Sequence, residues 1–264
     1  MTDTPHAHLA EQDGVLTVTF DRQDKLNAIS AEMTALLWDA VQQMETRDDL
    51  GVLVIRAHGP YFTAGIDIAG IDISERTPSQ YRRDYRQHTS LYDAFEALDK
   101  PIVVAAQGHC LGAGVEMAAS CDFRFAARSA TFQLPEITLA VIPGSGGISR
   151  VARLVGPQWA KWLAMAGEPV DAERALMIGL VHDVYPEDGF HGRVQDFARH
   201  LARLPRQAVG IAKMAIDLST STDQASARQL EQLANAVLAL GDEHKKRVAA
   251  FNERGRQRPQ HPGH

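Results

Sequence analysis

Two glutamates stand out because each lies in a sequence context that would bury it. Glu116 enters a predicted helix of otherwise small and apolar residues, and Glu136 is the only charged residue between Arg128 and Arg150. Burial raises the pKa of a carboxylic acid, which suits it to proton transfer near neutral pH. The pattern favours acid–base chemistry by a carboxylate pair. Alternatively, Glu116 could simply be an acid that stabilises a helix N-terminus, and Glu136 could be an acid on a surface loop.

Three glycine-bearing loops neighbour these acids, and each lies beside a predicted strand. They are 62–68, 108–116, and 134–136 with 142–147. Glycines between a strand and a helix let backbone N–H groups approach a ligand, and the helix N-terminus adds positive potential there. Such a loop can bind a phosphate or stabilise an oxyanion on a carbonyl substrate. Any one loop could be a plain tight turn, but the placement of both acids beside such loops favours carbonyl chemistry.

Other chemistries fit the sequence less well. No Lys-Ser or Lys-Thr pair follows these glycines, as a Walker loop requires, and the spacing over 108–114 differs from the dinucleotide fingerprint. Ser145 lacks the glycine two residues before it that a serine-hydrolase nucleophile elbow carries. None of the 11 histidines forms a ligand set with a second His or Cys, so we expect no metal site.

The elements that must position these residues alternate along the first half of the chain. Apolar runs predict strands at 15–20, 52–55, 102–106 and 123–126. Ser30 is a suitable N-cap for a helix whose apolar positions, from Met33 to Met44, follow helical spacing. Short, continuously apolar strands separated by helices are typical of a sheet covered on both faces. The sequence therefore predicts an α/β fold.

The second half changes character after about Pro186. Helical patterns cover 187–204, 206–220, 223–240 and 242–254, with no strand-like apolar run between them. We therefore expect a helical C-terminal region packed on an α/β core. Residues 1–10 and 255–264 are polar and aperiodic, which predicts a loose tail at each end.

The composition is that of an ordinary globular protein. Of 264 residues, 27 are basic and 33 acidic, and a net charge of −6 is too small to indicate a nucleic-acid partner. The two cysteines, Cys110 and Cys121, lie in apolar surroundings and are expected to be buried thiols in a reducing compartment. No secretory signal pattern begins the chain, and no apolar run approaches the roughly 20 residues that span a bilayer. These features predict a cytoplasmic protein without a membrane partner.

Several ordered motifs together resemble the enoyl-CoA hydratase/isomerase (crotonase) family. The segments that carry the resemblance are Arg-x-x-x-x-Asn-Ala within 21–28, Phe-Thr-Ala-Gly-Ile-Asp-Ile at 62–68, the glycine segment at 107–116 with Cys121-Asp122, Pro-Glu-Ile at 135–137, Ile-Pro-Gly-x-Gly-Gly at 142–147, Gly156, 172–181 and 250–254. The resemblance covers residues 14–255. In combination these motifs are far more specific than any single glycine pattern.

The resemblance implies a crotonase-like spiral of ββα units. It places a core with the active site at 10–190, a helical trimerisation region at 191–255 and a disordered tail at 256–264. It also implies a homotrimer, commonly paired into a hexamer, and an acyl-CoA thioester as substrate. Coenzyme A is then part of the substrate, and no separate cofactor is expected.

By matching positions, the resemblance also assigns roles to residues. Glu116 and Glu136 are the catalytic acids, and the backbone N–H groups of Ile66 and Ala113 form the oxyanion hole. The residues expected to bind the substrate or its CoA part are Ala64, Ile66, Asp67, Ile68, Ala69, Gly112, Ala113 and Gly144. The Gly144 backbone would also position a reacting water.

Glutamates at both acid positions resemble the hydratase branch, which adds water across a trans-2-enoyl thioester. Glu116 would be the base that deprotonates water and Glu136 the donor of a proton to Cα. Double-bond isomerisation by Glu136 alone, a non-catalytic acyl-CoA binder and a purely structural trimer are the alternatives. Ala113 and Ile66 are larger than the residues usual at their positions, which favours an acyl group other than a short straight chain.

Overall fold

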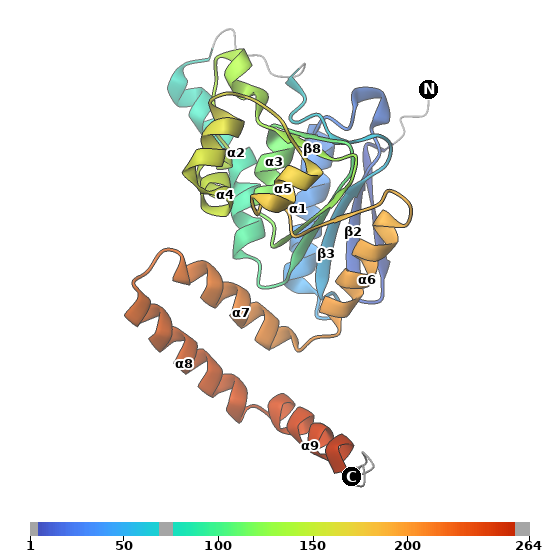
Figure 1. Cartoon of the computed structure of the whole chain (residues 1–264), viewed down its shortest axis with the longest axis vertical. Coiled ribbons are helices and arrows are strands. Elements are labelled where there is room, and N and C mark those ends of the chain that lie inside the picture. The colour runs from blue at the N-terminus through green and yellow to red at the C-terminus, as the bar shows by residue number, and fades with distance from the viewer. Residues whose placement is uncertain (1–4, 69–75, 257–264) are drawn as a thin grey trace, which may run out of the picture. The chain divides into compact units, whose positions relative to one another are not determined.

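The computed structural model describes residues 5–68 and 76–256. By its contacts the chain divides into two compact units, Met1–Arg203 and Leu204–His264. The first unit holds all the strands of the described chain (Figure 1). It also contains both glutamates and all three glycine loops.

The bounds of the elements are as follows. The strands are β1 Ala7–Gln12, β2 Val15–Phe20, β3 Val52–Ala57, β4 Tyr61–Thr63, β5 Ile102–Ala106, β6 His109–Leu111, β7 Phe123–Ala127, β8 Thr131–Gln133, β9 Val170–Asp171 and β10 Asp183–Tyr185. The helices are η1 Gln23–Lys25, α1 Ala31–Thr46, α2 Pro78–Ala97, α3 Ala113–Ala119, η3 Pro135–Leu139, α4 Gly147–Ala164, α5 Ala172–Met177, α6 Phe190–Ala202, α7 Arg206–Ser219, α8 Gln224–Leu240 and α9 Asp242–Arg256.

The first unit repeats one motif, in which a long strand, a short strand and a helix follow one another. The long strands, together with the three-residue β10, form a six-stranded sheet of order β1-β2-β3-β5-β7-β10. The other short strands form a four-stranded sheet of order β4-β6-β8-β9. From β2 to β10 the neighbours of the large sheet are parallel. In each repeat of this motif, a glycine loop lies either between the long strand and the short strand or at the end of the short strand. The predicted spiral of ββα units is confirmed by this arrangement.

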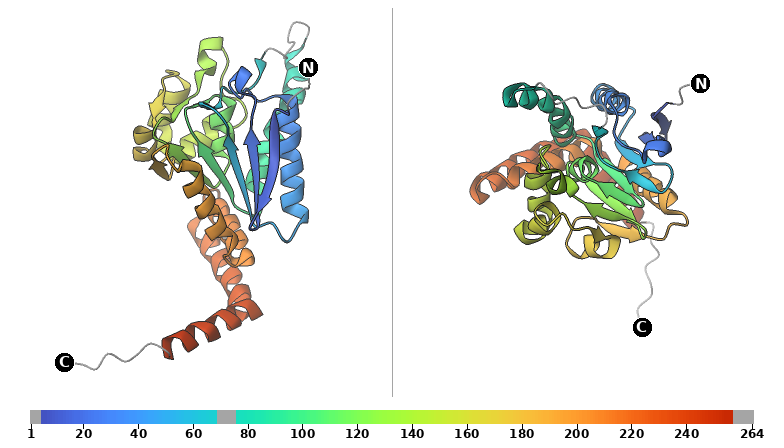
Figure 2. Two further views of the ribbon diagram at one scale, coloured as in Figure 1. Left: turned by 90° about the vertical axis from the view of Figure 1, so that its right-hand side faces the viewer. Right: turned by 90° about the horizontal axis from the view of Figure 1, so that it is seen from above.

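Helices cover both faces of the large sheet, and this explains why its strands are apolar without a break. In β3, Leu53 and Ile55 pack with α1 residues on one face, while Val52 and Val54 pack with α6 residues on the other. Alternate side chains of a strand point to opposite faces, so both sets are buried. Figures 1 and 2 show α1 and α6 on opposite sides of the sheet. Both cysteines are buried, as expected.

The N-terminal residues differ from the prediction. Residues 1–10 were expected to be a loose tail, but Ala7–Gln12 form β1, which pairs antiparallel with β2 in the register Ala7↔Phe20 to Gln12↔Val15. Backbone hydrogen bonds to β2 hold this edge strand, so it needs few apolar side chains. Only Ala7 among its residues is buried.

The second unit consists of α7, α8 and α9, so the predicted helical character of this region is confirmed. Asp223 caps α8 by accepting from the N–H groups of Ala225 and Ser226 at 3.0 and 3.1 Å. Helix α9 ends at Arg256, and the rest of the predicted tail lies outside the described residues. Among the helices of the described ranges, none has the length and apolar character needed to cross a membrane.

Candidate active site

A cavity of about 760 Å³ opens in the first unit, and both glutamates line it. Its walls come from α1, the 66–68 loop, α2, the N-terminal end of α3, and the segment from η3 to the start of α4. The lining residues are Ile29, Thr34, Leu37, Ile66, Ile68, Arg76, Tyr81, Arg82, Tyr85, Leu91, Tyr92, Ala113, Glu116, Glu136, Leu139, Ala140, Val141, Ile142, Gly144 and Ser145. The fold therefore brings the glycine loops and the acids to one place.

Glu116 is held rigidly in the wall of this cavity. It lies in the first turn of α3 and is 2% exposed. Its Oε1 accepts hydrogen bonds from the backbone N–H groups of Ser145 at 2.7 Å and Gly147 at 3.2 Å. A Cβ at 147 would lie 2.7 Å from Pro143 Cβ and 2.8 Å from Glu116 Oε1, so glycine leaves room for both groups. The loop before α4 thus fixes one carboxylate oxygen and leaves the other for a ligand.

The pKa of Glu116 is raised to about 7, mainly because burial disfavours its charged form. The charge of Glu136 raises the pKa further, while the two N–H groups and the nearby Arg150 lower it. A carboxylate with a pKa near 7 is suited to take up and release a proton at neutral pH.

Glu136 lies in the first turn of η3 and close to Gly112. Gly112 is the N-cap of α3 and has φ 52°, and a Cβ on it would lie 2.8 Å from Glu136 Oε1. Because only glycine leaves this space, Glu136 can approach the start of the helix that carries Glu116. Burial raises the pKa of Glu136, and its Oε2 is buried with no hydrogen-bond partner in the described part of the chain. Glu136 lines the cavity together with Glu116, so a carboxyl group whose neutral form is favoured by burial lies beside a space for a ligand.

Two backbone N–H groups complete the site. Gly65 has φ 93°, and a Cβ on it would lie 3.0 Å from the Leu111 oxygen and 3.6 Å from the Ala113 nitrogen, so the two glycine loops adjoin closely. On either side of Ile66, the Gly65 carbonyl and the Asp67 N–H bond to the backbone of Ile29 at 2.8 and 3.0 Å.

Neither the Ile66 N–H nor the Ala113 N–H, however, donates a hydrogen bond within the described residues. Ile66 and Ala113 both line the cavity, and Ala113 is the first residue of α3, where a helix has no acceptor for its N–H. Tyr92 steadies this turn, since its buried hydroxyl donates to the Ala113 carbonyl at 3.1 Å. Two unused donors beside two carboxyl groups of raised pKa form a site suited to proton transfer next to a carbonyl.

A family model described as enoyl-CoA hydratase/isomerase matches residues 10–260. The chain belongs to this family, whose members are also called crotonases. The match covers nearly the whole chain and confirms the resemblance of the motifs.

Two relatives and one solved structure illustrate the likeness. The chain is 33% identical to a probable mitochondrial enoyl-CoA hydratase 2 of Arabidopsis thaliana, over 91% of this chain and 80% of that protein. It is also 33% identical to the 2,3-dehydroadipyl-CoA hydratase of Escherichia coli, over 92% of this chain and 94% of that protein. The crystal structure of an enoyl-CoA hydratase from Bacillus anthracis superposes with a TM-score of 0.88 at 28% identity, covering 98% and 100% of the two chains. The chain therefore has the crotonase fold.

The other residues proposed for substrate binding lie in different places around this crotonase site. Ile68 and Gly144 line the cavity, whereas Ala64 and Asp67 do not. The Ala64 N–H bonds to the Leu26 carbonyl at 3.0 Å. Asp67 forms an ion pair with Arg22 at 2.6 Å, which ties the 66–68 loop to the early motif of the chain. Ala69 lies outside the described residues.

Three features of the site were not found from the sequence. Tyr85 and Tyr92 reach the cavity from α2, a mostly polar helix that the sequence pattern did not predict. The third is Arg150, which is 6% exposed although it carries a charge. No sequence signal separated it from Arg153, which lies three residues further along the same helix and is exposed.

Arg150 connects three parts of the site. Its Nη1 donates to the Ser145 carbonyl at 2.8 Å, and its Nε and Nη2 donate to the carboxylate of Glu96 at 2.9 and 2.8 Å. Nη2 also contacts Asp93 at 2.6 Å. Because the Ser145 N–H holds Glu116, Arg150 fixes the loop that orients this acid and ties it to α2.

We expect Arg150→Gln to lower turnover by roughly tenfold or more, since it removes a charged hydrogen bond from the Glu116-holding loop. Loss of the positive charge also raises the pKa of Glu116, so the rise of activity with pH should move to higher pH. Arg150→Lys keeps the charge and should leave that pH dependence near its original position. The pH profile of kcat is the measurement, and an unshifted profile in Arg150→Gln would contradict this role.

The raised pKa of Glu116 also predicts a pH dependence of stability. Its pKa in the folded protein is about 7 against an ordinary 4.5, so its contribution to stability is complete below pH 4.5 and is lost as the pH rises to about 7. The loss amounts to about 3 kcal/mol. Glu116→Gln carries no such group, so its free energy of unfolding, minus that of the wild type, should grow with pH over this range. Urea unfolding at several pH values measures this, and a difference independent of pH would rule out the shift.

Proposed function

We propose that the chain is an enoyl-CoA hydratase, which adds water across the double bond of a trans-2-enoyl-CoA thioester to give a 3-hydroxyacyl-CoA. The observation that carries the proposal is the pair of carboxyl groups, both with raised pKa, that line one cavity beside two unused N–H groups. The hydratase names of both reported relatives agree with it.

In the proposed reaction the thioester oxygen accepts hydrogen bonds from the N–H groups of Ile66 and Ala113. These donors stabilise the enolate-like charge that develops on this oxygen, and losing one such donor typically slows turnover about a hundredfold or more. In this proposal the Gly144 backbone, which lines the cavity, helps to position the reacting water. The acyl chain then extends past the two acids.

The carboxyl groups move the protons. Ionised Glu116 takes a proton from the water as the water oxygen bonds to Cβ, and protonated Glu136 gives its proton to Cα. The two charges repel, so the pair favours holding one proton between them. Transfer of a proton from Glu116 back to Glu136 restores the starting state. Only water and the thioester are consumed, so the reaction needs no cofactor.

The test is the absorbance of the conjugated thioester in crotonyl-CoA and in a longer trans-2-enoyl-CoA, followed by mass spectrometry of the product. We expect loss of absorbance and a gain of one water, both abolished in Glu116→Gln and in Glu136→Gln. If neither ester changes, hydration of these chains is excluded. Conversion of 3-enoyl-CoA esters would then support isomerisation, and binding without conversion would support an acyl-CoA binder.

We also propose that the chain forms trimers, which pair into hexamers. Apolar side chains on one face of α8 support association, because Leu233, Val237 and Leu240 recur at helical spacing and are 69%, 70% and 74% exposed. Phe251 of α9 is 76% exposed. Light scattering of the purified protein tests this, and a monomer mass would contradict it. The cytoplasmic location expected from the sequence stays a prediction.

A further inference from the structure

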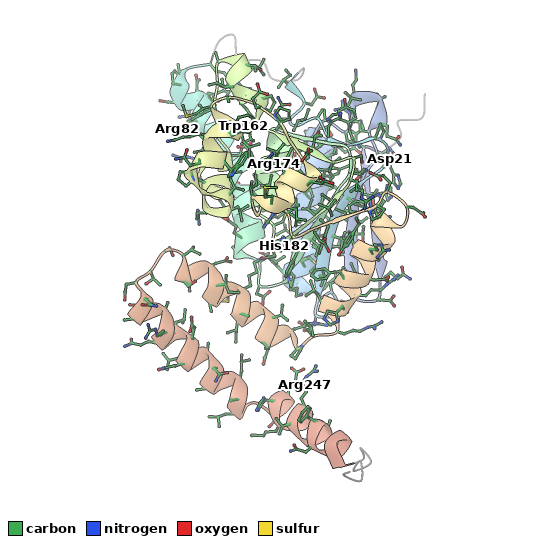
Figure 3. All side chains as sticks on the ribbon, viewed as in Figure 1. Asp21, Arg82, Trp162, Arg174, His182 and Arg247 are labelled. Atoms are coloured by element: carbon green, nitrogen blue, oxygen red, sulfur yellow. The ribbon has the colours of Figure 1, made fainter. Side chains whose placement is uncertain are left out.

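One wall of the active-site cavity has no part in the proposed reaction. It consists of Tyr81, Arg82 and Tyr85 of α2, with Arg76 just before the helix. Figure 3 shows Arg82 near the beginning of α2. A cation beside a cavity that must accommodate an acyl chain is unexpected, because a hydrocarbon chain gains nothing from it.

Tyr85 places this wall at the acid end of the cavity. Its hydroxyl shares a hydrogen bond with the Ser145 side chain, and the charges of Glu116 and Glu136 act on its pKa. A Cβ on Gly144 would lie only 3.0 Å from the Tyr85 ring. In the proposed binding mode, with the thioester at the Ile66 and Ala113 donors, the acyl chain extends past the acids toward α2.

Arg82 lies within one turn of Tyr85 along α2, about 4.5 Å along the helix axis. Tyr81, the residue before Arg82, stacks on Tyr85 with ring centroids 5.5 Å apart. The two tyrosine rings and Arg82 thus belong to one surface of the cavity wall. An acyl chain of moderate length can follow this surface.

Arg82 differs from the other arginines near the site because its charge has no partner among the described residues. Arg76, the other arginine that lines the cavity, has an interaction of its own. Near the site, Arg22 pairs with Asp67 and Arg150 pairs with Asp93 and Glu96. Arg82 is exposed and forms no ion pair within the described ranges of the chain.

The other wall is apolar. Leu139, Val141 and Ile142 line it with exposed fractions of 61%, 51% and 61%. The cavity thus offers apolar surface along its length and an unpaired cation at one side.

We propose that the preferred acyl group carries a carboxylate at its far end, and that Arg82 binds this carboxylate. The substrate class is then a CoA thioester of a dicarboxylic acid. A chain of methylene groups would lie against the apolar wall, and its terminal carboxylate would accept hydrogen bonds from the guanidinium. This inference rests on the proposed function for the direction in which the acyl chain runs.

Binding of two saturated esters tests the inference without turnover. Adipoyl-CoA and hexanoyl-CoA have the same number of acyl carbons and differ only in the terminal carboxylate. We expect titration calorimetry near pH 7.5 to show adipoyl-CoA binding roughly tenfold more tightly, a preference that weakens as salt is added. Equal affinities would overturn the proposal.

Variants of Arg82 test whether its guanidinium causes the preference for adipoyl-CoA. Arg82→Gln should remove the preference by weakening adipoyl-CoA alone, and Arg82→Lys should keep part of it. Arg83→Gln is the matched control, since Arg83 is the next residue of α2, is exposed and does not line the cavity. If Arg82→Gln weakens both esters equally, Arg82 contacts the CoA part that they share, and the proposal is wrong.

A parallel turnover assay separates this inference from the proposed function. It compares trans-2-hexenoyl-CoA with the same chain bearing a terminal carboxylate. If neither ester is hydrated, the proposed function fails while the binding result still decides the role of Arg82. If both are hydrated and the binding preference is absent, the proposed function stands and the inference about Arg82 fails.

Discussion

Glu136→Gln should lower hydration of crotonyl-CoA by about a hundredfold or more while binding of the ester persists. The amide of glutamine has the shape of the carboxyl group but has no proton acidic enough to transfer to a carbon. Because Glu136 Oε2 has no hydrogen-bond partner among the described residues, the replacement breaks no contact of that oxygen. The loss should therefore appear in kcat, with little change in the affinity for a saturated analogue such as butyryl-CoA.

Two controls sharpen this result. Glu168→Gln makes the same change at an exposed position that does not line the cavity, and its activity should match the wild type. The double variant with Glu116→Gln should lose much less than the product of the two single losses, because the acids act as a unit. Wild-type turnover in Glu136→Gln would remove this residue from the mechanism and with it the assignment of the proton donor.

The regular elements could be predicted because burial leaves a periodic mark on the sequence. The strand at 15–20 and the α8 pattern at 223–240 match β2 and α8 to within a residue. The strand β1 was missed because an edge strand is held by its backbone, which leaves no such mark. Helix α2 was missed because its polar first half lines a cavity rather than a core, and only its last turns, with Leu91 and Phe95, are buried in the core.

The candidate site could be predicted in part for a related reason. Glu116 and Glu136 could be predicted as site residues because each is an isolated charge among apolar residues. Both line the cavity. What the sequence could not show is how closely they approach, which depends on the space that Gly112 leaves beside Glu136. The supporting role of Arg150 was equally hidden, because its partners Asp93 and Glu96 lie more than 50 residues away in the chain.

Ala113→Pro should lower hydration by roughly a hundredfold to a thousandfold and should weaken binding of the ester as well. The replacement removes the N–H that we assign to the thioester oxygen and places a ring carbon in its position. Few other positions allow this change, but Ala113 is the first residue of α3, where proline is tolerated. Its N–H donates to no group within the described residues, so no internal hydrogen bond is lost.

The residue before a proline is normally restricted through its backbone N–H and its Cβ, and Gly112 lacks the Cβ. The variant should therefore fold, which thermal unfolding can verify. Ala113→Gly is the matched control, because it keeps the N–H and should retain most of the activity. If Ala113→Pro folds and hydrates crotonyl-CoA at the wild-type rate, the thioester oxygen is held elsewhere, and the orientation of the acyl chain toward Arg82 would have to be reconsidered too.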